Sequence, residues 1–101
     1  MTNELEVAVA QLVAVILDFT YGLTRSHAID SESYQRVVEV LGSFADQCSG
    51  MDSIPRAAVN VLVDLVPLVW GEAVDLEGTR KVEMIDAAID LGDRVRAIVA
   101  L

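Results

Sequence analysis

The only histidine of the chain, His27, stands between a hydroxyl group and a carboxylate. Ser26 precedes it and Asp30 follows three residues later, so the residue types of a serine-hydrolase triad share one short segment. A triad requires these side chains to converge in space beside an oxyanion hole, and closeness along a loop does not provide that arrangement. We therefore interpret His27 as a solvated loop residue and predict no catalytic residue.

Metal binding has little support among the residue types that usually hold a metal. One histidine and one cysteine, Cys48, are too few for a typical zinc site. No glutamate has a histidine three residues later, the spacing used by carboxylate-bridged helical bundles. The acidic stretch 75–78 is too short for a calcium loop, and the glycine patterns of phosphate-binding loops do not occur. We predict no metal and no cofactor, and we interpret Cys48 as a small core residue.

Three residues of the third apolar segment, Asn60, Asp64 and Trp70, are candidates for a pocket or an interface. Asp64 interrupts an apolar stretch, as Asp18 does in the first segment, and a buried carboxylate needs a partner because an unpaired buried charge is costly. Arg56 and Asn60 lie two turns and one turn before Asp64, where they could serve as that partner. The simpler interpretation places both aspartates in water at a helix surface. Trp70, the only tryptophan, is a core residue or an interface anchor.

Acidic residues outnumber basic ones by 16 to 7, and the formal net charge is −9. This balance disfavours direct binding to nucleic-acid phosphates, which requires clustered lysine and arginine. Carboxylates concentrate around the connection between the third and fourth apolar segments and along the fourth. The predicted partner-binding face consists of Glu72, Asp75, Glu77, Glu83, Asp86, Asp90 and Asp93. A solvated surface that maintains solubility is the simpler alternative to a face that docks on a basic protein.

Four blocks of helical periodicity, separated by turn signals, must position these residues. They cover about residues 4–21, 31–48, 54–74 and 79–100. No period-two alternation is long enough to predict a β-strand. The short connections predict a single all-α domain over residues 1–101, an up-down-up-down four-helix bundle.

Residues at the ends of these blocks predict where each helix begins and ends. Asn3, Asp30 and Ser53 occupy N-cap positions, and Gly22 suits the left-handed position that ends a helix. Pro67 lies inside the third block and predicts a kink. The start of the fourth block stays open, because two basic residues there oppose the helix dipole. These basic residues are Arg80 and Lys81. The alternative is an earlier start, with Asp75 as the cap and Gly78 inside the helix.

The apolar content of 53% is concentrated in the first and third blocks, which are apolar almost all round. One narrow polar stripe remains on each block, formed by Glu4, Gln11 and Asp18 in the first and by Arg56, Asn60 and Asp64 in the third. A helix at a protein surface usually carries an apolar arc only a little over 100° wide. Small apolar side chains are also tolerated in water. We predict instead that a second copy covers these faces in a twofold homodimer.

The N-terminus and the two apolar stretches indicate the compartment. No basic residue precedes the first apolar stretch, and a secretory signal needs one. Charged and polar residues interrupt both apolar stretches, so neither reaches the about 20 consecutive apolar residues of a membrane span. We predict a cytoplasmic protein without a membrane span, and the preference for arginine over lysine suggests a bacterial or phage source.

Together these observations predict a small acidic, non-enzymatic protein–protein interaction module. In this interpretation it is a regulator or inhibitor that binds a basic partner protein. One alternative is a helical dimer that binds a small molecule or acts as a small enzyme, with a pocket near Asp64 and Trp70. Another alternative is a structural subunit of a larger assembly, which concentration-dependent polymerisation would reveal.

Overall fold

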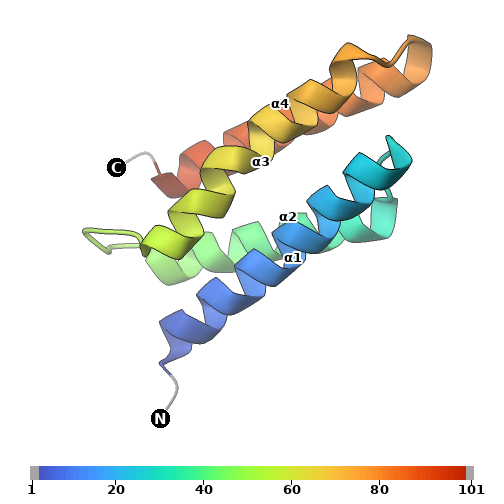
Figure 1. The fold of residues 1–101 in the computed structure, drawn as a ribbon. Helices are drawn as coiled ribbons and strands as arrows, with labels where there is room; N and C mark the ends of the chain where they lie inside the picture. The colour runs from blue at the N-terminus through green and yellow to red at the C-terminus, as the bar shows by residue number, and fades with distance from the viewer. Residues whose placement is uncertain (1–2, 100–101) are drawn as a thin grey trace.

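The computed structural model describes residues 3–99, and this part of the chain folds into four α-helices and no strand (Figure 1). The helices are α1 (Glu4–Ser26), α2 (Ser31–Cys48), α3 (Arg56–Val74) and α4 (Gly78–Val99). Successive helices run in opposite directions, so the predicted all-α, up-down-up-down bundle is confirmed.

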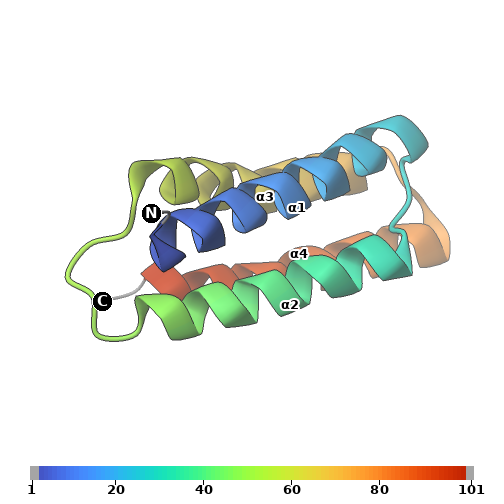
Figure 2. The same cartoon turned by 90° about the horizontal axis from the view of Figure 1, so that it is seen from below.

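The order of the helices around the bundle differs from their order along the chain. α1 packs against α2 and α3, and α4 packs against the same two helices. α1 and α3 form one layer and α2 and α4 the other, and the link 49–55 crosses from one layer to the other (Figure 2). The fold is therefore two antiparallel helical hairpins, α1–α2 and α3–α4, packed side by side with their tips at the same end.

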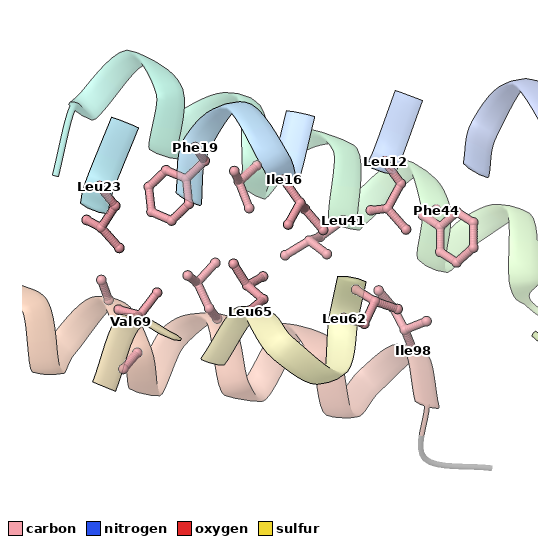
Figure 3. Packing of buried hydrophobic residues seen from close by; sticks show 14 of the residues in the cluster. Leu12, Ile16, Phe19, Leu23, Leu41, Phe44, Leu62, Leu65, Val69 and Ile98 are labelled. Carbon is pink, nitrogen blue, oxygen red and sulfur yellow. The ribbon is translucent and has the colours of Figure 1, made fainter. Parts of the chain in front are cut away.

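The hydrophobic core lies between the two hairpins and receives side chains from all four helices (Figure 3). Buried positions recur every three or four residues, as expected for one face of a helix. In α1 they are Leu12, Ile16, Phe19 and Leu23, and Leu62, Leu65 and Val69 of α3 lie in the same cluster. Among residues 3–99, the buried core contains no ionisable side chain other than the thiol of Cys48.

The end of α1 was predicted wrongly. Gly22 does not end the helix, which continues to Ser26 and is capped by His27 in the left-handed conformation at φ 55°. Leu23 lies just past the predicted end and is 2% exposed, so continuing the helix buries a large apolar side chain. That burial is worth about 1.5–3 kcal/mol and exceeds the cost of about 1 kcal/mol for a glycine inside a helix.

The predicted caps of α1 and α2 are confirmed, whereas that of α3 is not. Asn3 Oδ1 accepts from the Leu5 N–H, and Asp30 Oδ2 accepts from the Ser33 N–H, both at 2.9 Å. α3 begins two residues later than predicted, with Pro55 rather than Ser53 at the N-cap.

α3 continues without interruption through Pro67. The proline removes a backbone donor and leaves the carbonyl of Val63 without its helical hydrogen bond. Both residues are exposed, so water can satisfy that carbonyl without ending the helix. The predicted kink therefore does not divide α3 into two helices.

α4 begins at Gly78, one residue before the predicted start. Gly78 therefore belongs to the helix, as the alternative predicted, whereas Asp75 lies three residues before its first residue and does not cap it. Gly78 has φ 63°, a conformation that glycine adopts without steric cost. The first turn of α4 contains no acidic residue. Arg80 and Lys81 near its start therefore remain unfavourably placed relative to the helix dipole. Ala100, the predicted last residue of this helix, lies outside the described residues.

α1 and α3 are each long and apolar enough to cross a membrane by length and composition alone. This is weak evidence, because core helices of soluble proteins pass the same test. Only 28% of the residues in each apolar window are buried inside the bundle. Both helices therefore present much of their apolar surface outside the core.

Candidate functional site

Three of the predicted partner-binding carboxylates line one open groove between α2 and α4. Glu83, Asp86 and Asp90 follow each other at spacings of three and four residues, which places them on one stripe of α4. The groove has a volume of about 530 Å³. Its walls are completed by Ile29, Ser31, Tyr34 and Ala87. Carboxylates beside an apolar floor can hold a side chain that has an aliphatic stem and a cationic head.

Asp90 is held in place by two donors from different helices. The Tyr34 hydroxyl on α2 donates to Asp90 Oδ2, and the Arg94 Nε–H, one turn further along α4, donates to the same oxygen at 3.1 Å. The hydrogen bond from Tyr34 and the charge of Arg94 lower the pKa of Asp90. Burial, and then the bond to Asp90, raise the pKa of the Tyr34 hydroxyl far above its usual value. Asp90 is therefore ionised and oriented at the groove.

The two other groove carboxylates take part in no hydrogen bond or ion pair within residues 3–99. Glu83 and Asp86 are both exposed, and their charges are available to a ligand in the groove. Like charges three and four residues apart on a helix repel each other by about 0.2–0.5 kcal/mol per pair. A cation bound in the groove would relieve that repulsion.

The remaining predicted partner-binding residues lie outside this groove. Asp93 is exposed and forms an ion pair with Arg96. Asp75 and Glu77 are exposed in the connection between α3 and α4. Glu72 faces α1, where its Oε2 lies 2.8 Å from the Nδ1 of His27. The seven carboxylates therefore divide among several places on the surface and do not form one continuous face.

The second predicted group, Asn60, Asp64 and Trp70, is not assembled into a pocket. Asn60 and Asp64 are exposed on the outer side of α3, and Trp70 is 42% exposed. None of the three residues lines any of five surface hollows that lie among residues 3–99. Asp64 has no hydrogen bond or ion pair with Arg56 or Asn60 in this part of the chain. Asp18 is also exposed, so the simpler interpretation of both aspartates agrees with their positions.

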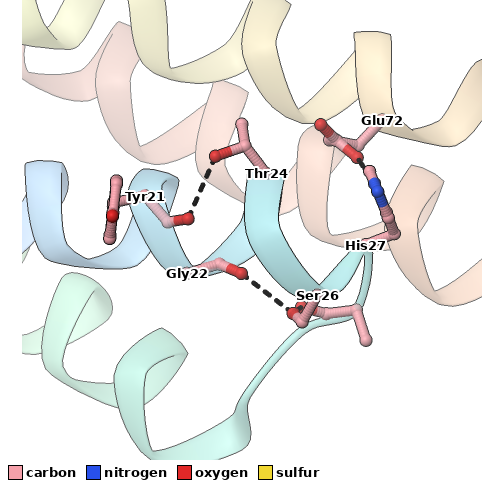
Figure 4. Close-up of polar contacts among 7 residues, drawn as sticks. Tyr21, Gly22, Thr24, Ser26, His27 and Glu72 are labelled. Carbon is pink, nitrogen blue, oxygen red and sulfur yellow. Dashed lines mark hydrogen bonds and ion pairs between the residues drawn. The ribbon is translucent and has the colours of Figure 1, made fainter.

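The residues that resembled a catalytic triad make separate structural contacts, of which Figure 4 shows those of Ser26 and His27. The Ser26 hydroxyl lies 2.9 Å from the Gly22 carbonyl oxygen and 3.2 Å from that of Ala28. His27 contacts Glu72, and Asp30 caps α2. These three side chains therefore stabilise the turn between α1 and α2.

The only cysteine lies in the core, and the potential metal ligands of the described residues do not cluster. Cys48 is buried in the core, and burial raises the pKa of its thiol, which keeps it protonated. No group of three or more potential metal ligands occurs within residues 3–99.

The chain matches no family model, no curated protein and no solved structure.

Sequence reasoning missed the contact between Tyr34 and Asp90, which are 56 residues apart. The helical spacing of the second block places Tyr34 among its apolar residues, and the Tyr34 ring packs against Phe19 with centroids 6.1 Å apart. The feature that could have indicated this contact is the Tyr34 hydroxyl, because a half-buried tyrosine usually needs a polar partner. Nothing in the sequence identified Asp90 as that partner.

Proposed function

We propose that this protein is a small acidic, non-enzymatic interaction module, a regulator or inhibitor that binds a basic partner protein. The observation that supports the proposal is the convergence of Glu83, Asp86 and Asp90 on one groove between α2 and α4. A lysine or arginine of the partner would place its aliphatic stem against Ile29 and Ala87 and its charge among the carboxylates.

The charge of the whole chain supports the same partner class. With a net charge of −9, the protein attracts cationic proteins from a distance and repels acidic ones. Long-range attraction speeds the encounter with the partner, whereas the groove fixes where on the surface the partner binds. Binding should therefore weaken as salt increases, because salt screens interactions between exposed charges.

The experiment compares two charge-reversal variants that change the net charge equally. Glu83→Lys/Asp86→Lys alters the groove and retains Asp90, whose bond to Tyr34 joins two helices. Asp18→Lys/Asp46→Lys alters two exposed carboxylates on α1 and α2 that are outside the groove. The probe is a lysine-rich peptide with alanine spacers, and binding is measured by isothermal titration calorimetry.

The groove variant should weaken peptide binding at least about tenfold, whereas the control should weaken it by no more than about twofold to threefold. Circular dichroism checks that both variants remain folded. Equal losses in the two variants would show that total charge, not the groove, attracts the peptide. That result would contradict the proposed site.

A further inference from the structure

Exposed apolar side chains gather on the outer surface of the hairpin formed by α3 and α4. Residues 3–99 contain nine large apolar side chains that are well exposed, and none belongs to α2. Five of them form what we call the α3–α4 seam patch: Val63 (60% exposed), Trp70 (42%), Val74 (71%), Val82 (58%) and Ile89 (51%).

The contact between Val66 and Gly92 shows why these five residues are neighbours. A Cβ placed on Gly92 would lie 3.9 Å from Val66 Cγ1, so these two positions face each other across the helix pair. At 100° per residue, Val63, Trp70 and Val74 lie about 40–80° around α3 from Val66. Val82 and Ile89 lie about 60–80° around α4 from Gly92, counted in the same sense from the N-terminus to the C-terminus of each helix. Because α3 and α4 are antiparallel, the same sense of rotation leads to the same side of the helix pair. Both sets are exposed and therefore border the same outer seam.

The area of the patch matches the apolar share of a standard-size protein interface. The exposed fractions correspond to about 500 Å² of apolar surface for side chains of ordinary size. A standard interface buries about 800 Å² on each partner, and in homodimers about 65% of it is apolar. The expected apolar share is therefore about 520 Å², which the patch nearly supplies by itself.

The charges at the two ends of the patch are complementary to each other. Arg96 follows Ile89 by seven residues and lies at the end of the hairpin where α4 ends. Its exposed ion pair with Asp93 of the same chain is the contact that pairing with a second copy would share or replace. Asp75 and Glu77 are exposed at the opposite end, in the connection between α3 and α4. A twofold axis through the centre of the patch, perpendicular to the helices, places Arg96 of each copy opposite the acidic connection of the other. A parallel alignment would place like charges together.

We infer that the α3–α4 seam patch is the interface of an antiparallel homodimer. Trp70 and Ile89 lie near its centre, and Arg96 pairs with the Asp75–Glu77 end of the second copy at each rim. The carboxylates of the acidic groove lie about 40–120° further around α4 than Val82 and Ile89, so Asp86 borders both the groove and the patch. Each dimer therefore presents two acidic grooves, one at each edge of the interface.

The first experiment follows self-association of the full chain by analytical ultracentrifugation from micromolar to millimolar concentration. We expect a particle of twice the 10.9 kDa chain mass. Trp70 is the only tryptophan, so burial of its ring should shift the fluorescence emission to shorter wavelength over the same concentration range. A monomer at all concentrations would overturn the inference, as would a shift that appears only with anionic lipid vesicles.

Two variants with matched exposure locate the interface. Ile89→Glu puts a carboxylate at the centre of the patch, and Leu17→Glu puts one on α1, where the side chain is 55% exposed against 51% for Ile89. Ile89→Glu should raise the dimer dissociation constant at least about tenfold, whereas Leu17→Glu should leave it nearly unchanged. The reverse result would place the interface on α1 and overturn the inference. Circular dichroism confirms that both variants are folded.

A charge-reversal cycle tests the antiparallel alignment. Arg96→Glu and Glu77→Arg should each weaken the dimer, and the double variant should recover most of the affinity because opposite charges then meet again. Simple addition of the two losses would overturn this alignment. Salt separates this inference from the proposed function. Screening removes the repulsion between two −9 chains and also the attraction at the two rims, so the largely apolar dimer should depend on salt much less than binding of the basic peptide does.

Discussion

The Tyr34 hydroxyl of α2 donates a hydrogen bond to Asp90 Oδ2 of α4, and it thereby joins the two hairpins at the wall of the acidic groove. α2 and α4 are neighbours in the same layer. The bond links a half-buried neutral group to a carboxylate that Arg94 also contacts. It therefore contributes both to the stability of the fold and to the position of a groove charge.

Replacing Tyr34 by phenylalanine should destabilise the protein by about 1–2 kcal/mol. A hydrogen bond to a charged group contributes somewhat more than a neutral one, and the partial exposure of this pair reduces the value. The ring and its contact with Phe19 are retained in the variant. Urea unfolding measures the change, and Tyr21→Phe is the control because Tyr21 is 64% exposed. An equally small effect in both variants would show that the bond contributes little.

The same bond predicts how stability changes with pH. The folded-state pKa of Asp90 is lowered, so its contribution is present above the unfolded value of about 3.9 and is lost as pH falls through the folded value. The folded-state pKa of Tyr34 is raised, so its contribution is present below about pH 10 and is lost as pH rises further. The stability difference between wild type and Tyr34→Phe should thus be largest between these limits. Urea unfolding across the pH range checks it, and a constant difference would contradict the assignment.

His27 predicts an unusual order of stability among small substitutions. It occupies the left-handed conformation at φ 55° and also contacts Glu72. His27→Ala loses the contact and retains the backbone strain, whereas His27→Gly loses the contact and removes the strain. We expect the glycine variant to be more stable than the alanine variant by about 1 kcal/mol. Thermal unfolding of both variants measures this difference, and a more stable alanine variant would exclude strain at this position.

The limits of α2 could be predicted from the sequence because its signals are local. Asp30 and the apolar stripe define it, and both of its ends agree with the predicted range of 31–48. The order of the helices around the bundle could not be predicted, because it depends on which apolar faces fit together. The Tyr34–Asp90 contact depends on that same order. The acidic groove was therefore predicted only as a row of carboxylates on the fourth helix, without its other wall.

Two glycines should respond to alanine with opposite signs. Gly22 lies inside α1, and a Cβ there would meet no atom within 4 Å. Gly22→Ala should therefore stabilise the protein by about 0.5–1 kcal/mol, since alanine restricts the unfolded chain more and favours the helix.

Gly78 also has open space around it, but its φ of 63° disfavours any Cβ. Gly78→Ala should destabilise the protein by about 1 kcal/mol, because available space does not compensate for backbone strain. Chemical unfolding of the two variants measures both signs, and stabilisation by Gly78→Ala would mean that α4 begins with a different backbone conformation.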